Sequence, residues 1–303
     1  MAILSSDEIT LLDGAVGTEL RARGVQVRDY RSSLWSALAC VEAPEAVTRL
    51  HLDYINAGAD VITLNNYAIT PVLLAREGRE EELEPLIRAT ARCAAEARDR
   101  ADRKVLLAGS LPPLNTSYAA DLVDRFSNNL ATYRRLVAIL NPLVDCYLCE
   151  TLSTAEEARA AATAADQSGK PFMVSWTIER TGRGLRGGDS FAAAVDALKG
   201  LTPQALLVNC SSTSAITAAI PHLRQLSDLP IGGYANPIQD EPAGGEPLRV
   251  IRNPLTPDQY AHIARDWFSA GATIVGGCCD TSPAYTAALA RMARDAKRRT
   301  APK

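Results

Sequence analysis

The chain has 303 residues, of which 47% are hydrophobic, and a formal net charge of −3. This allows a large buried core, in one large α/β domain or two smaller ones, and gives no electrostatic reason to expect nucleic acid or an anionic membrane as a partner. Residues 1–10 lack the pattern of a secretory leader, and no apolar run is long enough to cross a bilayer. With seven cysteines and no such leader, the chain is expected to be cytoplasmic, in a reducing compartment.

Eight short apolar segments follow one another at fairly regular intervals and predict strands. They are Leu11–Gly14, Val61–Asn65, Val105–Ser110, Val144–Glu150, Phe172–Ile178, Ala205–Cys210, Ile231–Ala235 and Thr273–Gly277. Amphipathic, alanine-rich segments between them predict helices. Three of these helices end near a glycine, which is a usual stop signal: Pro44–Ala57, Ala155–Gln167 and Pro257–Ser269.

Eight successive β/α units favour an α/β fold of the (β/α)8 or TIM-barrel class, as a single domain over residues 1–303. An open doubly wound sheet is the alternative. The segment after the first predicted strand reads Gly-Ala-Val-Gly-Thr-Glu, however, which lacks the glycine spacing of a dinucleotide site. In a barrel the active site is built at the C-terminal ends of the strands.

Polar residues gather at the predicted strand ends and are expected to converge on one mouth. They are Asp13, Asn65 with Asn66 and Tyr67, Ser110, Glu150 with Thr151, Cys210, Asn236, and Cys278 with Cys279. Two carboxylates of this set can hold a substrate ammonium group. Taken alone, Asp13 is equally well interpreted as a turn or helix cap, and Glu150 as a partner of a helix N-terminus.

Three thiols of this set, Cys210, Cys278 and Cys279, predict a metal site. Because adjacent side chains on a strand point to opposite faces, the last two can share one ion only if the backbone turns there, and Gly276 and Gly277 permit a turn. Three thiolates with an open fourth position suit a catalytic zinc ion. Packing or a strained vicinal disulfide is the alternative.

The other cysteines are Cys40, Cys93, Cys146 and Cys149, and the simplest interpretation is that they are small core residues. Cys146 and Cys149 form a Cys-x-x-Cys motif inside a predicted strand. A separation of three residues puts them on opposite faces, which argues against a redox pair.

Six motifs occur in order along the chain: Asp-Gly-Ala-Val-Gly-Thr-Glu-Leu (13–20), Leu-Trp-Ser-Ala (34–37), Ala-Gly-Ala-Asp-Val-Ile-Thr (57–63), Glu-Thr (150–151), Val-Asn-Cys (208–210) and Gly-Gly-Cys-Cys (276–279). Together they resemble the homocysteine S-methyltransferase family. The resemblance runs from near residue 11 to near residue 285, which is essentially the whole chain.

The resemblance implies a zinc-dependent (β/α)8 barrel that methylates the thiol of homocysteine to give methionine. The zinc ligands of the family match Cys210, Cys278 and Cys279, and its homocysteine-binding acids match Asp13, which is followed by Gly14, and Glu150. Small-molecule substrates are therefore the expected partners, and the oligomeric state is left open.

The resemblance also implies a donor pocket. Trp35 and Tyr67, which follows Asn66, match aromatic residues that face the onium methyl groups in betaine-using relatives, although either ring can instead be simple core. Thr151 stands where the betaine enzymes have tyrosine. This difference favours S-methylmethionine or S-adenosylmethionine as the methyl donor.

Three departures from the family pattern bear on substrate choice: the rim loop 109–114, Asp280 after the cysteine pair, and the long loop 236–254, whose composition fits a lid. They leave room for a different thiol or selenol acceptor. Two other classes also stay open, a hydrolytic zinc enzyme that uses bound water and a non-catalytic zinc-binding or redox-sensing protein.

Overall fold

The computed structural model describes residues 9–28, 34–241 and 254–300 of the chain. Eight parallel strands form its centre: β1 (Thr10–Leu11), β2 (Val61–Thr63), β3 (Leu106–Leu111), β4 (Cys146–Leu152), β5 (Phe172–Trp176), β6 (Ala205–Asn209), β7 (Ile231–Ala235) and β8 (Ala272–Gly277). Each strand pairs with the next in sequence from β2 to β8, and β8 pairs with β1. A parallel bridge between Leu12 and Val61 joins the two ends of the sheet, which closes the barrel.

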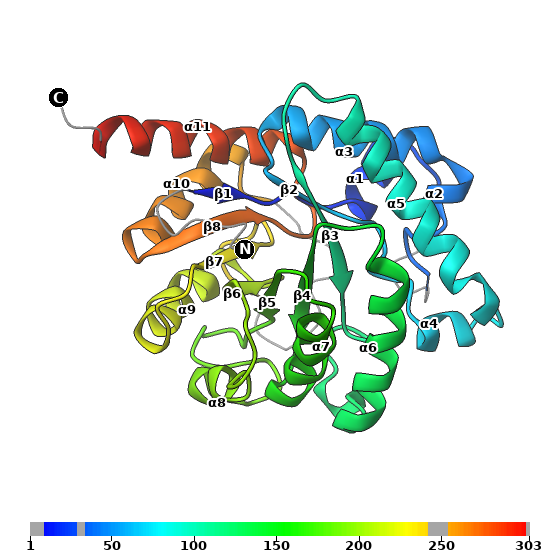
Figure 1. Ribbon diagram of the computed structural model, residues 1–303. Coiled ribbons are helices and arrows are strands. Elements are labelled where there is room, and N and C mark those ends of the chain that lie inside the picture. The colour runs from blue at the N-terminus through cyan, green and yellow to red at the C-terminus, as the bar shows by residue number, and fades with distance from the viewer. Residues whose placement is uncertain (1–8, 29–33, 242–253, 301–303) are drawn as a thin grey trace.

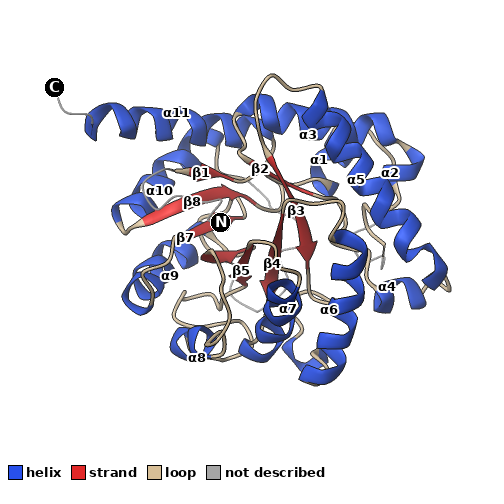
Figure 2. Ribbon diagram, viewed as in Figure 1, coloured by secondary structure: helices blue, strands red, loops and turns tan. Residues whose placement is uncertain are grey.

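Helices surround this barrel (Figures 1 and 2). Their bounds are α1 (Gly17–Ala22), α2 (Ala39–Glu42), α3 (Pro44–Ala57), α4 (Pro71–Ala75), α5 (Leu83–Asp99), α6 (Phe126–Leu140), α7 (Ala155–Gln167), α8 (Phe191–Asp196), α9 (Thr213–Leu226), α10 (Pro257–Ser269) and α11 (Pro283–Thr300), with short 3₁₀ turns at Glu80–Glu82 and Ala120–Leu122. The predicted (β/α)8 fold is confirmed.

The end signals in the sequence explain why two predicted helices, α3 and α10, have the predicted bounds. Pro44 occupies the first turn of α3, and Gly58 ends that helix in the left-handed conformation with φ 118°. Thr256 and Gln259 form a reciprocal capping box at the start of α10. The first strand is shorter than predicted and ends at Leu11, although the carbonyl of Asp13 still accepts the backbone N–H of Gly277 in β8 at 3.0 Å.

The core has two layers. Side chains such as Leu12, Met173 and Leu207 fill the barrel interior, and a larger layer lies between the sheet and the helices. Cys146 belongs to the interior layer and Cys149 to the outer one. The prediction that these two thiols point to opposite faces of β4 is therefore confirmed. No helix in the described parts of the chain has the length and apolar character needed to cross a membrane.

Candidate active site

A cavity of about 1330 Å³ opens at the C-terminal ends of the strands. Its lining includes Asp13, Gly14, Trp35, Tyr67, Tyr118, Glu150, Thr151, Arg186, Cys210, Cys278, Cys279 and Asp280. These residues lie far apart in the sequence and follow most of the strands of the barrel. The parallel sheet brings them together because all its strands end at the same side.

The sulfur atoms of Cys210, Cys278 and Cys279 lie within 4.8 Å of one another. The Sγ atoms of Cys210 and Cys279 are 3.6 Å apart. Soft thiolate ligands at this spacing fit a metal ion such as zinc, and the adjoining cavity leaves room for a further ligand. The donor set therefore fits the metal site that the sequence predicts.

Strand β7 holds two of these cysteines in place. The backbone N–H of Cys210, at the end of β6, donates to the carbonyl of Tyr234 at 3.1 Å, and the N–H of Cys278, at the end of β8, donates to Ala235 at 2.9 Å. Because β6 and β8 flank β7, the two cysteines leave the sheet on either side of the same strand. Their side chains meet there.

The predicted role of the glycines before the cysteine pair was wrong. Gly276 and Gly277 lie within β8, and the chain turns after them, at Cys279 and Asp280, where Asp280 has φ 59°. Both glycines are instead required by close packing. A Cβ atom on Gly277 would lie 2.2 Å from Oγ1 of Thr281, and one on Gly276 would lie 2.6 Å from Cβ of Leu12.

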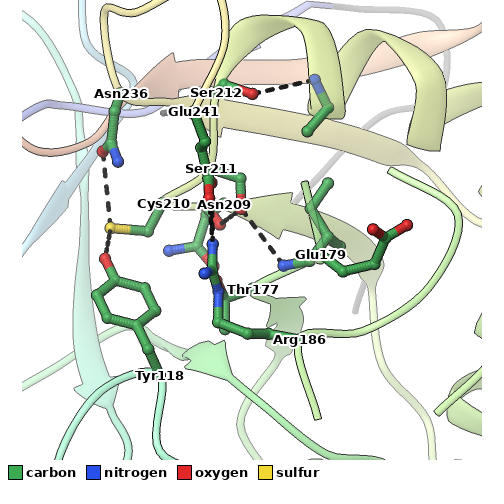
Figure 3. Close-up of polar contacts among 12 residues, drawn as sticks. Tyr118, Thr177, Glu179, Arg186, Asn209, Cys210, Ser211, Ser212, Asn236 and Glu241 are labelled. Atoms are coloured by element: carbon green, nitrogen blue, oxygen red, sulfur yellow. Dashed lines mark hydrogen bonds and ion pairs between the residues drawn. The ribbon is translucent and has the colours of Figure 1, made fainter. Parts of the chain in front are cut away.

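Two polar side chains contact Cys210 (Figure 3). The hydroxyl of Tyr118 lies 2.6 Å from Sγ, and Sγ donates to Oδ1 of Asn236 at 3.6 Å. Hydrogen bonds from Cys278, then from Cys279 and Tyr118, hold the pKa of Cys210 well below its usual range. The same contact with Cys210 raises the pKa of Cys278.

Asp13 and Glu150 are buried carboxyl groups in the cavity wall. Oδ2 of Asp13 accepts the backbone N–H of Thr63 at 2.9 Å. Glu150 accepts the hydroxyls of Ser110 at 2.5 Å and of Tyr234 at 3.4 Å. Both carboxyls are thus fixed by neutral donors, and within the described ranges neither forms an ion pair.

Burial, with a smaller contribution from the nearby Glu150, raises the pKa of Asp13 to about 8 against the hydrogen bond from Thr63. Burial likewise raises the pKa of Glu150 to about 7. Carboxylates without a cationic partner in a buried site are stabilised by any cation that enters it. An ammonium group in the cavity is such a cation.

Trp35 and Tyr67 both line the cavity, as the donor-pocket hypothesis requires. The Tyr67 hydroxyl is 2.7 Å from Oγ of Ser117. Trp35 packs against α1, since the guanidinium carbon of Arg21 lies 4.7 Å from its ring centroid and a Cβ on Gly17 would lie 2.2 Å from its Nε1. The indole already contacts one cation of the chain itself.

Asn66 is placed differently from the other candidates, since it does not line the cavity. Its side-chain amide donates to the carbonyl of Ser110 at 2.8 Å and accepts the N–H of Ser110 at 3.1 Å. Both polar groups of Asn66 are therefore used to fix the end of β3. This in turn positions the Ser110 hydroxyl on Glu150.

The structure also locates two of the three departures from the family pattern. Asp280 lines the cavity beside the cysteine pair, and its backbone N–H donates to Oγ1 of Thr18 at 3.0 Å. Of the proposed lid 236–254, residues 242–253 lie outside the described residues, while Pro254 lines the cavity. Sequence reasoning missed Tyr118 and Arg186, which sit in loops without periodicity and carry no motif.

Comparison with known proteins identifies the family. The family model described as homocysteine S-methyltransferase matches residues 10–293. The homocysteine S-methyltransferase of Escherichia coli strain K12 is 35% identical, over 95% of this chain and 96% of its own. A selenocysteine methyltransferase from Astragalus bisulcatus is 28% identical, over 90% of this chain and 89% of its own.

A solved structure is similar in fold as well. The metallated form of the homocysteine methyltransferase MmuM from Escherichia coli superposes with a TM-score of 0.78 and 32% sequence identity, covering 94% of this chain and 96% of that chain. The match thus extends over nearly all of both chains. The range of the family model, residues 10–293, includes the strand ends that carry the cysteines and the two buried acids. The chain belongs to the homocysteine S-methyltransferase family.

Proposed function

We propose that this protein is a zinc-dependent methyltransferase that moves a methyl group from an onium donor to the thiol of homocysteine, giving methionine. The observation that carries this proposal is the placement of three cysteine sulfurs and two buried acids in the wall of one cavity. Within the described ranges, neither acid forms an ion pair. Membership of the family supports the reaction type. The donors that we favour are S-methylmethionine and S-adenosylmethionine.

Cys210, Cys278 and Cys279 would hold the zinc ion. When bound, zinc would supply the stabilisation of a thiolate at neutral pH, where a free thiol is mostly protonated. The residues of the chain must supply substrate binding and alignment. The cavity beside the cysteines must hold the amino-acid end of the acceptor and must align the donor methyl group with the acceptor sulfur.

Asp13 and Glu150 suit the amino-acid end of the acceptor. Their raised pKa values reflect burial without a cationic partner, and the ammonium group of homocysteine would provide that partner. Gly14 follows Asp13 in the cavity wall, and a Cβ there would lie 2.7 Å from Oγ1 of Thr281. This position therefore admits only glycine without a shift of its neighbours.

Trp35 and Tyr67 suit the donor. An aromatic ring attracts a sulfonium by about 0.5–2 kcal/mol, and this attraction is lost when the donor becomes a neutral thioether. The rings thus favour binding of the donor and departure of the product. We place Asn66 behind this pocket rather than in it, since its amide is bonded to Ser110.

A selenol acceptor is the second candidate function. The relative from Astragalus bisulcatus is named a selenocysteine methyltransferase, and a selenol needs the same metal ligands and the same ammonium contacts as a thiol. Competition between homocysteine and selenocysteine for one donor distinguishes the two acceptors. A higher kcat/KM for the selenol would make it the preferred substrate.

A methyl-transfer assay tests the proposal. Zinc-loaded protein is supplied with homocysteine and with S-methylmethionine, S-adenosylmethionine or betaine in turn. We expect methionine from a sulfonium donor, no methionine with Cys278→Ala, and near-normal activity with Cys149→Ala, whose thiol lies outside the cavity. A zinc-loaded protein that forms no methionine from any donor would refute the proposed reaction.

We also propose that the whole chain works as one barrel domain in the cytoplasm. The described cysteines are all free thiols, and a reducing compartment would keep the cysteine cluster able to bind a metal. Fractionation of cells that express the intact protein, followed by the same methyl-transfer assay, tests this location.

A further inference from the structure

Side chains from three loops form a series of contacts that ends at Cys210 (Figure 3). None of them is a substrate-binding group named above. The hydroxyl of Tyr118 lies 2.6 Å from Sγ of Cys210. The guanidinium carbon of Arg186 lies 4.9 Å from the centroid of the Tyr118 ring. Nη2 of Arg186 donates to both carboxylate oxygens of Glu241, at 2.9 and 3.2 Å. A metal-site cysteine is thus linked to an ion pair through one tyrosine.

Each side chain of this network comes from a different loop that follows a strand of the barrel. Tyr118 lies between β3 and α6, Arg186 between β5 and α8, and Glu241 after β7. Arg186 is also tied to Thr177, by its backbone N–H at 3.0 Å and by Nε at 3.3 Å. The side chains of Arg186 and Glu241 are only 22% and 9% exposed, so salt screens their attraction less than that of a surface pair.

The three cysteines differ in their polar neighbours. Cys210 has Tyr118 and Asn236 as polar neighbours. Within the described ranges, no side chain other than a cysteine forms a hydrogen bond with the sulfur of Cys278 or Cys279. A phenol hydroxyl is a proton donor toward a thiolate, and such a bond both orients the sulfur and draws electron density from it.

We infer that Tyr118 is a positioning residue of the metal site, which donates a hydrogen bond to the Cys210 thiolate and is held in place by Arg186 and Glu241. This inference rests on the proposed zinc function. Tyr118 has φ 68°, a conformation that is uncommon for a residue with a side chain. The stacked Arg186, itself anchored at two points, explains what keeps the ring against Cys210 in spite of this backbone conformation.

Zinc affinity and a spectroscopic readout test the inference without relying on activity. Tyr118→Phe removes the hydroxyl and keeps the ring, and Arg186→Met removes the stacked cation. Tyr133→Phe is the matched control, since the hydroxyl of this buried tyrosine donates to the carbonyl of Pro112 at 2.8 Å and does not line the cavity that holds the cysteine cluster. The affinity of each protein for zinc is measured by competition with a chromophoric chelator.

We expect Tyr118→Phe to weaken zinc binding about tenfold, which is the usual cost of removing an outer partner of a metal ligand. Arg186→Met should weaken it less, and the loss in the double variant should be smaller than the sum of the two single losses, because Arg186 acts in part through the tyrosine. In cobalt-substituted protein, the sulfur-to-metal charge-transfer band should move to longer wavelength in Tyr118→Phe. Neither readout should change in Tyr133→Phe.

The outcomes separate this inference from the proposed function. Wild-type protein that binds zinc, together with an unchanged affinity and an unchanged cobalt spectrum in Tyr118→Phe, would overturn the role of Tyr118 and leave the zinc enzyme intact. Independent, additive losses in the double variant would overturn the role of Arg186. Wild-type protein that binds no zinc would overturn both.

Discussion

Asn209 at the end of β6 is hydrogen-bonded to Thr151 of β4 across β5, the strand that separates these two in the sheet. Nδ2 of Asn209 donates to Oγ1 of Thr151 at 2.8 Å, and Oδ1 accepts the backbone N–H of Thr151 at 3.0 Å. Thr151 has φ 61° at a register shift in β4, directly after Glu150. The amide at the end of β6 therefore stabilises the irregular backbone that presents Glu150 to the cavity.

Replacing Asn209 with alanine is expected to destabilise the protein by about 2–4 kcal/mol, because buried polar groups of Thr151 and Ser175 lose their partner. Urea denaturation measures this change. Asn128→Ala, an exposed asparagine in α6, is the control and should stay within about 0.5 kcal/mol of wild type. A loss at Asn209 no larger than that of the control would contradict this account of Thr151.

The raised pKa values of Asp13 and Glu150 predict a pH-dependent stability in the absence of substrate. Both folded-state values, about 8 and about 7, lie above the ordinary values of 3.8 and 4.5. Stability from these groups is therefore fully present below pH 4 and declines as the pH rises toward 8, because the folded state retains the protons. Urea denaturation between pH 5 and pH 8 should show the decline.

Asp13→Asn should reduce that decline by on the order of 2 kcal/mol, since the amide oxygen still accepts the Thr63 N–H and no buried charge forms. The same variant should raise the KM for homocysteine, because the ammonium group loses a carboxylate. A variant with wild-type KM and a wild-type pH dependence of stability would show that Asp13 carries neither role.

The aromatic pocket gives a prediction about the donor alone. Trp35→Leu should raise the KM for the sulfonium donor by roughly 2- to 30-fold, which corresponds to a loss of about 0.5–2 kcal/mol, and should leave the KM for homocysteine nearly unchanged. Initial rates with each substrate varied in turn provide the measurement. Equal increases in both KM values would mean that the indole supports the cavity as a whole instead of binding the donor.

Much of this fold could be predicted because its signals are local. The bounds of α3 and α10 follow from proline at the first turn, a capping box and glycine near the end. The cysteine cluster followed from its position after two buried strands. The reason for Gly276 and Gly277 could not be found in the same way. Their need for close packing depends on Leu12 and Thr281, whose contacts exist only in the folded barrel.

The sequence did not predict how the loop residues of the site are oriented. Asn66 and Tyr67 are neighbours in the sequence, yet only Tyr67 lines the cavity, because the side-chain amide of Asn66 is hydrogen-bonded to Ser110. Tyr118 and Arg186 lie in loops of irregular backbone, so no periodicity indicates which way they point. Their stacking is a tertiary contact between segments that no motif connects.

Chelation should remove the metal in a way that depends on the cysteine cluster. We expect wild-type protein to bind about one zinc ion per chain, and each single alanine variant at Cys210, Cys278 or Cys279 to lose zinc to a chelator far more readily. Cys93→Ala, a buried cysteine outside the cavity, should bind zinc as wild type does. Inductively coupled plasma mass spectrometry after dialysis gives the stoichiometry.

The measurement that tests the central claim most directly is X-ray absorption at the zinc edge, on the intact protein with and without homocysteine. We expect three sulfur ligands from the cysteines alone and a fourth sulfur when homocysteine is added, with no fourth sulfur from methionine. A zinc shell that is unchanged by homocysteine, in protein that has bound it, would contradict the claim that the cysteine cluster serves to activate the acceptor thiol.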